Sequence, residues 1–234
     1  MNCAFTEVRL LPVHLGSVVG NDITWVLMIE AVLFDFGGVI LTSPFETFAD
    51  YEIETGLPQD TIRTLNSTNP DTNAWAKFER REINPEEFIE LFQIEAAAQG
   101  FVVDARKLIE NLHGALRPNM VEALRRCSNN LKTAMLTNNI TPIGSQPLSA
   151  DVQEVVEMFD VIIESSVEGC RKPDQKFYDI ACERLSIKPE KCVFLDDLGV
   201  NLKPARAMGM TTIKVVDPDQ AIAELSAVVG FSLN

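Results

Sequence analysis

The stretch "AVLFDFGGVI" at residues 31–40 decides the fold, because four apolar residues lead directly to Asp35 and two glycines follow it closely. A short run that is apolar throughout is typical of a strand buried on both faces of a parallel sheet. Four later runs have the same form: "KTAML" (132–136), "DVIIE" (160–164), "CVFL" (192–195) and "TTIKVV" (211–216). Amphipathic stretches separate them, including "MVEALRRC" (120–127) and "DQKFYDIACERL" (174–185). The alternation predicts an α/β fold with a doubly wound parallel sheet, a Rossmann-like core.

The first two apolar runs are separated by residues 35–131, which is too long for an ordinary crossover connection. Two stretches inside this segment read as helices: "PFETFADYEIETG" and "NPEEFIELFQIEAAAQG". The second begins with Asn84 as N-cap, followed by Pro85 at the first helical position and Glu87 to complete a capping box. The segment therefore predicts an inserted helical domain.

We expect residues 43–114 to form this helical cap, while residues 28–42 and 115–234 form the catalytic core. Within the expected cap, Trp75 and Phe78 are interpreted as packing residues, with a substrate-contacting pair as the alternative.

The first 27 residues are expected to be an extension outside the core, with an added edge strand around "ITWVLM" (23–28) as the alternative. This region is rich in apolar residues, but His14, Asn21 and Asp22 interrupt it. A membrane-spanning helix needs about 20 consecutive apolar residues, so none is expected here. The missing basic start also argues against a secretory signal.

A formal net charge of −14 and an isoelectric point near 4.6 argue against partners that are polyanions, such as nucleic acids and anionic membranes. Five cysteines without a CxxC pair, together with two histidines, offer no zinc-binding spacing. The cysteines are expected to be reduced, which is typical of a cytoplasmic protein. No feature of the sequence specifies an oligomeric state.

Polar residues follow the apolar runs, where the carboxyl ends of parallel strands would meet. These residues are Asp35 after the first run, Thr137 and Asn138 after the second, Arg171 and Lys172 downstream of the third, and Asp196 and Asp197 after the fourth. In an open parallel sheet the ligand binds beyond the carboxyl ends of the strands, so we expect these side chains to converge on one site.

Three carboxylates in one place repel one another, and a hard cation with oxygen ligands relieves that repulsion. Magnesium fits best, and it commonly shares its coordination shell with phosphate oxygens. Lys172 then supplies a second positive charge for a phosphoryl group. A carboxylate is able to attack phosphorus and form an aspartyl-phosphate, which water later hydrolyses.

Four motifs, in this order, resemble those of the haloacid dehalogenase superfamily of aspartate-nucleophile hydrolases, over about residues 29–234. The motifs are "FDFGG" with Asp35, "LTNN" with Thr137, "RKPD" with Lys172 and "FLDDLGVN" with Asp196, Asp197 and Asn201. The stretch "VFLDDLGVNLKPARAMGMTTIKV" is especially similar to the N-terminal phosphatase domain of soluble epoxide hydrolases and to the N-terminal domain of certain acyl-CoA dehydrogenases.

The resemblance implies a role for each matching residue. Asp35 would be the nucleophile and a metal ligand, and the backbone carbonyl of Gly37 and the carboxylate of Asp197 would be further Mg²⁺ ligands. Asp196 would act beside them, and Asn201 would orient the acids. Thr137 and Asn138 would bind the phosphoryl group, and Lys172 would neutralise its charge. The expected function is that of a magnesium-dependent phosphatase hydrolysing a small organic phosphate monoester through an aspartyl-phosphate.

One position departs from the family pattern. Two residues beyond the nucleophile, phosphatases of this family usually carry a second Asp that protonates the leaving oxygen, whereas this chain has Gly37. General acid catalysis contributes roughly 10² to 10⁴-fold, so two alternatives stay open. One is a catalytically weak or inactive domain that binds a phosphorylated ligand or a protein partner. The other is a metal-independent dehalogenase, which the pair Asp196 and Asp197 disfavours.

Overall fold

The computed structural model describes residues 28–233 apart from residues 111–113, 140–142, 144 and 146. The extension expected at residues 1–27 lies outside the described residues, as does nearly all of the alternative strand at 23–28.

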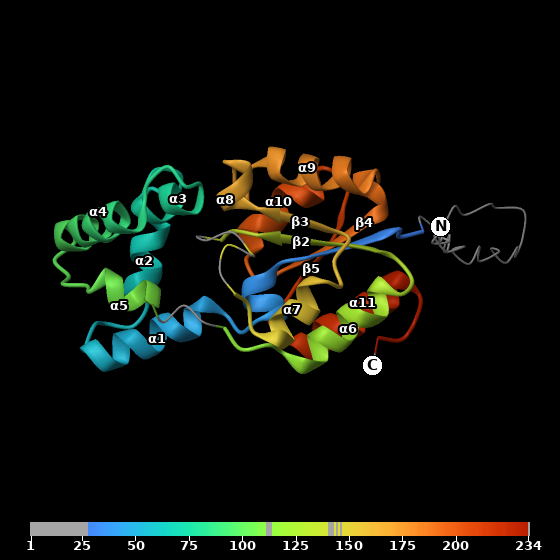
Figure 1. Ribbon diagram of the computed structural model, residues 1–234, viewed down its shortest axis with the longest axis horizontal. Coiled ribbons are helices and arrows are strands. Elements are labelled where there is room, and N and C mark those ends of the chain that lie inside the picture. The colour runs from blue at the N-terminus through green and yellow to red at the C-terminus, as the bar shows by residue number, and fades with distance from the viewer. Residues whose placement is uncertain (1–27, 111–113, 140–142, 144, 146, 234) are drawn as a thin grey trace, which may run out of the picture.

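The core of the protein is a parallel sheet of five strands in the order β3-β2-β1-β4-β5 (Figure 1). The strands are β1 (Ala31–Phe34), β2 (Lys132–Thr137), β3 (Val161–Glu164), β4 (Cys192–Asp196) and β5 (Thr211–Lys214). Ala31 lies beside Lys132 of β2 and Cys192 of β4, so the first apolar run forms the central strand. The predicted doubly wound α/β fold is confirmed.

Helices cover both faces of the sheet, which explains why the strands are apolar throughout. On one face, Val32 and Phe34 pack with α6 (Pro118–Ser128), α7 (Ala150–Val156) and α11 (Pro218–Val229). On the other face, Ala31 and Leu33 pack with α9 (Gln175–Leu185) and α10 (Gly199–Ala207). The short helix α8 (Ser165–Glu168) follows β3 directly. Helices α6 and α9 occupy the two stretches that the amphipathic pattern predicts.

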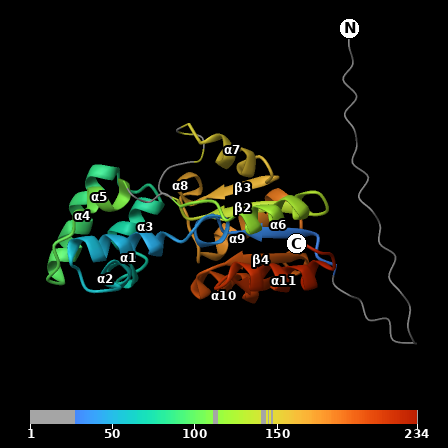
Figure 2. The ribbon, with the colours of Figure 1, turned by 90° about the horizontal axis from the view of Figure 1, so that it is seen from below.

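Five helices between β1 and α6 form a separate helical body, visible at the left of Figures 1 and 2. We call this unit the helical insertion, and its members are α1 (Pro44–Thr55), α2 (Thr61–Ser67), α3 (Ala74–Glu79), α4 (Pro85–Ala98) and α5 (Ala105–Glu110). It has its own hydrophobic core, in which Phe88 and Phe92 are almost fully buried. The predicted capping box is present, because Glu87 N donates to Asn84 Oδ1 at 2.9 Å and Asn84 N donates to Glu87 Oε2 at 2.8 Å.

The chain enters and leaves the helical insertion through two neighbouring segments. Leu41 and Leu116 form an isolated antiparallel bridge, and Thr42 N donates to the carbonyl of Ala115 at 2.8 Å. Both segments adjoin the carboxyl end of β1, where the strand order of the sheet reverses. Ligands of doubly wound sheets bind at such a reversal.

Two further expectations concern the whole chain. The four cysteines in the described part of the chain are free and buried. Among the described helices there is none with both the length and the apolar character needed to cross a membrane.

Candidate active site

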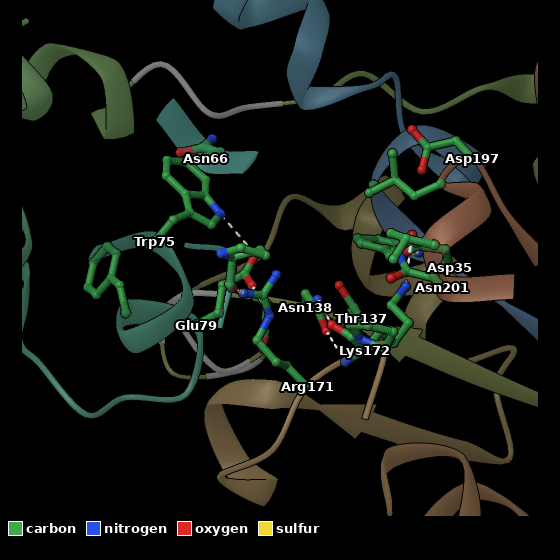
Figure 3. Close-up of a pocket in the computed structure, with 18 of the residues that line it drawn as sticks. Asp35, Asn66, Trp75, Glu79, Thr137, Asn138, Arg171, Lys172, Asp197 and Asn201 are labelled. Atoms are coloured by element: carbon green, nitrogen blue, oxygen red, sulfur yellow. Dashed lines mark hydrogen bonds and ion pairs between the residues drawn. The ribbon is translucent and has the colours of Figure 1, made fainter. Parts of the chain in front are cut away.

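Asp35 is held at the carboxyl end of the central strand. Its backbone N–H donates to the carbonyl of Leu195 at 2.9 Å, which carries the pairing of β1 with β4 one residue beyond β1. Its Oδ1 accepts a hydrogen bond of 2.6 Å from the N–H of Phe36. The side chain is buried at the bottom of the site, beside Lys172 and Asn201 (Figure 3). The strand thus delivers one carboxylate in a fixed orientation.

Lys172 connects two of the three predicted carboxylates. Its Nζ lies 2.8 Å from Asp35 Oδ2 and 2.8 Å from Asp196 Oδ2, and its side chain is 1% exposed. Burial by itself would lower the pKa of Lys172, but the two carboxylates together outweigh burial and raise this pKa. Lys172 therefore holds a buried positive charge directly against Asp35.

Asp196 is completely buried, and both of its oxygens accept hydrogen bonds. Oδ1 accepts from the backbone N–H of Leu198 at 2.8 Å, and Asn201 Nδ2 lies 3.0 Å from each oxygen. The carbonyl of Asn201 in turn accepts a hydrogen bond of 2.7 Å from the hydroxyl of Tyr178. These contacts fix Asp196 where it orients Lys172.

Asp197 has a more open environment than Asp196. Burial, followed by the charge of Asp196, raises the pKa of Asp197 from 3.8 to about 6. The hydroxyl of Ser43, next to the start of α1, donates to Asp197 Oδ2 at 3.3 Å. Gly38 packs against the same carboxylate with a φ of 81°, and a Cβ built there would lie 2.4 Å from Asp197 Oδ2. Only glycine fits this second position of the glycine pair.

The donor set suits a magnesium ion. One carboxylate oxygen from each of Asp35, Asp196 and Asp197 lies within 4.8 Å of the other two. Burial first, and then the charges of Asp196 and Asp197, raise the pKa of Asp35 well above its ordinary value, although Lys172 opposes the rise. Crowded carboxylates whose charges are destabilised in this way are relieved by a hard divalent cation.

Thr137 and Asn138, at the carboxyl end of β2, make different contributions to the site. Thr137 is the last residue of β2, and it is buried while lining the cleft in front of Lys172 (Figure 3). Asn138 uses its carboxamide to hold the backbone of Lys172: Nδ2 donates to the carbonyl at 3.0 Å and Oδ1 accepts from the N–H at 2.9 Å. The Asn138 carboxamide was expected to bind a phosphoryl group, but its oxygen and its nitrogen are both hydrogen-bonded to the backbone of Lys172.

The helical insertion contributes two residues to the wall of the cleft near Arg171: Glu79, which the sequence analysis did not select, and Trp75, for which it left substrate contact as the alternative to packing. Arg171 Nε lies 2.7 Å from Glu79 Oε2, and Trp75 Nε1 donates to Glu79 Oε1 at 2.9 Å. Burial raises the pKa of Glu79, and the contacts with Arg171 and Trp75 offset only part of the rise. No local pattern in "AWAKFER" marks Glu79, because its importance comes from a partner far along the chain.

A cleft of about 1310 Å³ lies between the sheet edge and the helical insertion. Asp35, Thr137, Lys172, Asp197 and Asn201 line one side (Figure 3). Trp75, Glu79 and Asn66 from the helical insertion line the other. The structure thus brings all the predicted site residues to one place, with Asp196 directly behind the cleft wall.

At the carboxyl end of the central strand, Asp35 thus lies beside a buried lysine and close to two further acids, Asp196 at the end of β4 and Asp197 directly after it. Residues 29–209 match the haloacid dehalogenase-like hydrolase family, and the chain belongs to this family. The predicted resemblance is therefore confirmed.

Among curated relatives, mouse Acyl-CoA dehydrogenase family member 10 is 36% identical over 212 residues, which are 88% of this chain and 20% of that protein. Mouse Bifunctional epoxide hydrolase 2 is 39% identical over 116 residues, covering 49% of this chain and 21% of that protein. The matches thus span about a fifth of these two relatives. Sesquiterpene phosphatase astK of Aspergillus oryzae is 28% identical over 204 residues, covering 86% of this chain and 97% of that protein.

Solved structures show the same fold. A HAD family enzyme of Bacteroides thetaiotaomicron, in complex with magnesium and inorganic phosphate, matches with a TM-score of 0.54 and 18% identity, covering 80% of this chain and 93% of that one. L-2-haloacid dehalogenase from Xanthobacter autotrophicus matches with a TM-score of 0.55 and 18% identity, covering 86% of this chain and 83% of that one.

Proposed function

We propose that this protein is a magnesium-dependent phosphatase that hydrolyses a small organic phosphate monoester through an aspartyl-phosphate on Asp35. The observation that carries the proposal is the contact of 2.8 Å between Lys172 Nζ and Asp35 Oδ2, close to the carboxylates of Asp196 and Asp197. A buried cation against the nucleophile is suited to an anionic phosphoryl group. Relatives named as phosphatases, from Aspergillus oryzae and Mycobacterium tuberculosis, support the same reaction class.

Each residue has a definite task in this proposal. The carboxylate of Asp35 attacks phosphorus while the bond between phosphorus and the ester oxygen breaks. The leaving oxygen departs as an anion or takes a proton from water, and the product alcohol leaves the site. Lys172 together with the Thr137 hydroxyl holds the phosphoryl oxygens. Water then attacks the aspartyl-phosphate and releases phosphate. Asp196 holds the ammonium group of Lys172, and the side chain of Asn138 holds its backbone.

Magnesium would be held by Asp35, by the backbone carbonyl of Gly37 and by Asp197. Asp196 was also expected near the ion, and we propose that its occupied oxygens make it the support of Lys172 instead. When bound, the ion neutralises charge that develops on the phosphoryl oxygens. We further propose that the helical insertion acts as a cap over the site.

A second candidate is a weak or inactive binding domain, and Gly37 favours it because the usual acid is missing. Gly37 has a φ of −71° and a ψ of 130°, which any residue adopts, so the backbone does not require glycine here. A metal-independent dehalogenase is less well supported, because Asp196 and Asp197 would only repel the nucleophile without a cation.

A screen of phosphate esters with and without magnesium separates these candidates. Aryl, sugar and lipid phosphates would be assayed for released phosphate, and a 2-haloacid for released halide. The phosphatase proposal expects ester hydrolysis that needs magnesium. Phosphate-ester binding without turnover would favour the inactive domain, and halide release unaffected by a chelator would favour the dehalogenase.

A further inference from the structure

The wall of the cleft that faces the catalytic residues is mainly apolar. Its apolar members come from the helical insertion, from the segments joining it to the core and from the start of α10: Leu41, Phe48, Trp75, Phe78, Ile109 and Val200. Val200 is 52% exposed there, although it lies one residue before Asn201. Leu41, Trp75 and Ile109 are partly exposed, whereas Phe48 and Phe78 are buried in the core of the helical insertion. Partly exposed apolar side chains that gather in a concave surface are typical of a binding site for an apolar group.

Charges buried in this wall are already compensated by the protein. Arg171 and Glu79 form an ion pair of 2.7 Å, with side chains 21% and 9% exposed. Arg80 is paired with Glu82 at 2.6 Å and also donates to the carbonyl of Asp71 at 3.1 Å. A substrate that draws a counter-charge from Arg171, Glu79 or Arg80 would have to break one of these pairs. Arg63 and Asp71 also line the cleft, but both are exposed to solvent.

Trp75 is held rigidly at the surface of the wall. Its ring meets Phe48 and Phe88 edge to face, with centroids 5.5 Å away in each case, and its Nε1–H is bonded to Glu79. Figure 3 shows Trp75 and Asn66 across the cavity from Asp35 and Asp197. A fixed aromatic surface gives a large apolar contact at little cost in conformational entropy.

We propose that the leaving group of the substrate is a bulky, uncharged and largely apolar alcohol, such as a long alkyl or fused aryl alcohol, and that it packs on Trp75. The proposal rests on the proposed phosphatase function and adds the chemical class of the substrate. The cleft of about 1310 Å³ is far larger than a phosphoryl group needs. Polar side chains also line this wall, among them Arg63, Asn66, Ser67 and Asp71, and the buried Asn66 Oδ1 accepts no hydrogen bond within the described residues. Sugar phosphates, whose hydroxyls would donate to such groups, are therefore the competing substrate class in the test.

Binding of n-alkylphosphonates, from methyl to decyl, tests this class without requiring turnover. Calorimetry in the presence of magnesium should show affinity that rises about threefold to fourfold per added methylene until the wall is covered. The matching alkyl phosphates should show a parallel rise in kcat/KM. A flat series would overturn the proposal, because the apolar wall would then contribute nothing.

Variants of Trp75 locate the contact. Trp75→Ala should weaken binding of decylphosphonate by about tenfold and leave methylphosphonate unchanged. Trp75→Phe should restore most of the loss. Phe101→Ala is the matched control, because Phe101 packs against the core of the helical insertion without lining the cleft. Equal effects of Trp75→Ala and Phe101→Ala would overturn the assignment to Trp75.

The two proposals fail in different ways. If no alkyl phosphate is hydrolysed but the phosphonates still bind with the expected dependence on length, the phosphatase function is wrong and the ligand class stands. If glucose 6-phosphate or a nucleotide is hydrolysed with a higher kcat/KM than decyl phosphate, the apolar class is wrong and the phosphatase function stands.

Discussion

Arg171 Nε lies 2.7 Å from Glu79 Oε2, so an ion pair joins the residue directly before Lys172 to the last residue of α3. Arg171 Nη1 also donates to the carbonyl of Pro70 at 3.3 Å. These contacts connect the sheet edge to the helical insertion at the cleft. Because the neighbouring Lys172 is held through its backbone by Asn138, a change at Arg171 reaches the site through only one peptide bond.

Arg171→Leu should lower the free energy of unfolding by about 3 kcal/mol, the lower end of the cost of leaving a buried charge unpaired. The raised pKa of Glu79 means that its ionised form destabilises the folded state, so stability falls as pH rises through that pKa. Removing Arg171 takes away a contact that lowers this pKa, so the loss should be larger at about pH 8 than at about pH 5, which is closer to the ordinary value of 4.5. Thermal unfolding at both pH values measures this.

Arg125→Leu is the matched control, because Arg125 pairs with Glu154 at 3.0 Å and the two side chains are 46% and 64% exposed. An exposed pair contributes about 0 to 1 kcal/mol. Equal losses in the two variants would mean that the Arg171 pair adds nothing beyond an ordinary surface pair.

Asp35→Asn should abolish turnover and leave the fold intact, because a neutral amide of nearly the same shape does not attack phosphorus. Phosphate release and circular dichroism measure the two effects. Asp179→Asn, an exposed carboxylate on α9, is the control and should behave as wild type. Activity within tenfold of wild type in the Asp35 variant would remove Asp35 as the nucleophile.

Magnesium binding should depend on pH through Asp197. Its folded-state pKa of about 6 lies above the ordinary 3.8, so the metal-free protein should lose stability as pH rises from about 4 to 6. Magnesium binds the ionised carboxylate, so its stabilisation of the thermal midpoint should be larger at about pH 7.5 than at about pH 5.

Asp197→Asn should reduce that magnesium-induced shift and raise the magnesium concentration needed for turnover. Both follow from removing the charge of one proposed ligand while keeping its shape. An unchanged magnesium titration in this variant would assign the ion to other groups.

Gly37→Asp should raise the turnover of alkyl phosphates, by up to the roughly 10² to 10⁴-fold of a positioned general acid. Aryl phosphates should gain much less, because their leaving groups depart as anions. The backbone conformation at Gly37 does not require glycine, since its φ is −71°. Leaving-group series for wild type and variant measure the difference.

Gly38→Ala is the contrasting variant, because its φ is 81° and its Cβ would clash with the Asp197 carboxylate. It should weaken magnesium binding and lower all rates together. If Gly37→Asp leaves the leaving-group dependence unchanged while magnesium affinity is intact, another group or a water already supplies the proton.

The sheet and the position of Asp35 at the end of its central strand were predictable from local sequence. A strand buried on both faces must be apolar throughout, so five such runs revealed the strands, and parallel strands necessarily bring their carboxyl ends to one edge. The capping box at Asn84 was equally readable, because its hydrogen bonds join residues three apart. The sequence pointed to Asp35, Thr137, Lys172 and Asp197 as candidates for the same reason, since each follows a strand or belongs to a short motif, and the fold brings them to one cleft.

Distinctions within these motifs needed the tertiary structure. The sequence places Asp196 beside Asp197 and Gly37 beside Gly38 without separating their tasks. The fold separates them, because Asp196 turns inward to Lys172 whereas Asp197 faces the cleft, and because only Gly38 takes a left-handed conformation.

The sequence by itself determined a central strand ending in one carboxylate, a parallel sheet around it and a long helical segment between the first two strands. Only the tertiary structure decided that Glu79 meets Arg171, that Asn138 holds the backbone of Lys172 and that Trp75 faces the cleft. The physical reason is the separation in sequence between the residues that interact. Strand and helix patterns are set by neighbours a few residues apart, whereas these contacts join separate elements whose meeting depends on the packing of the whole chain.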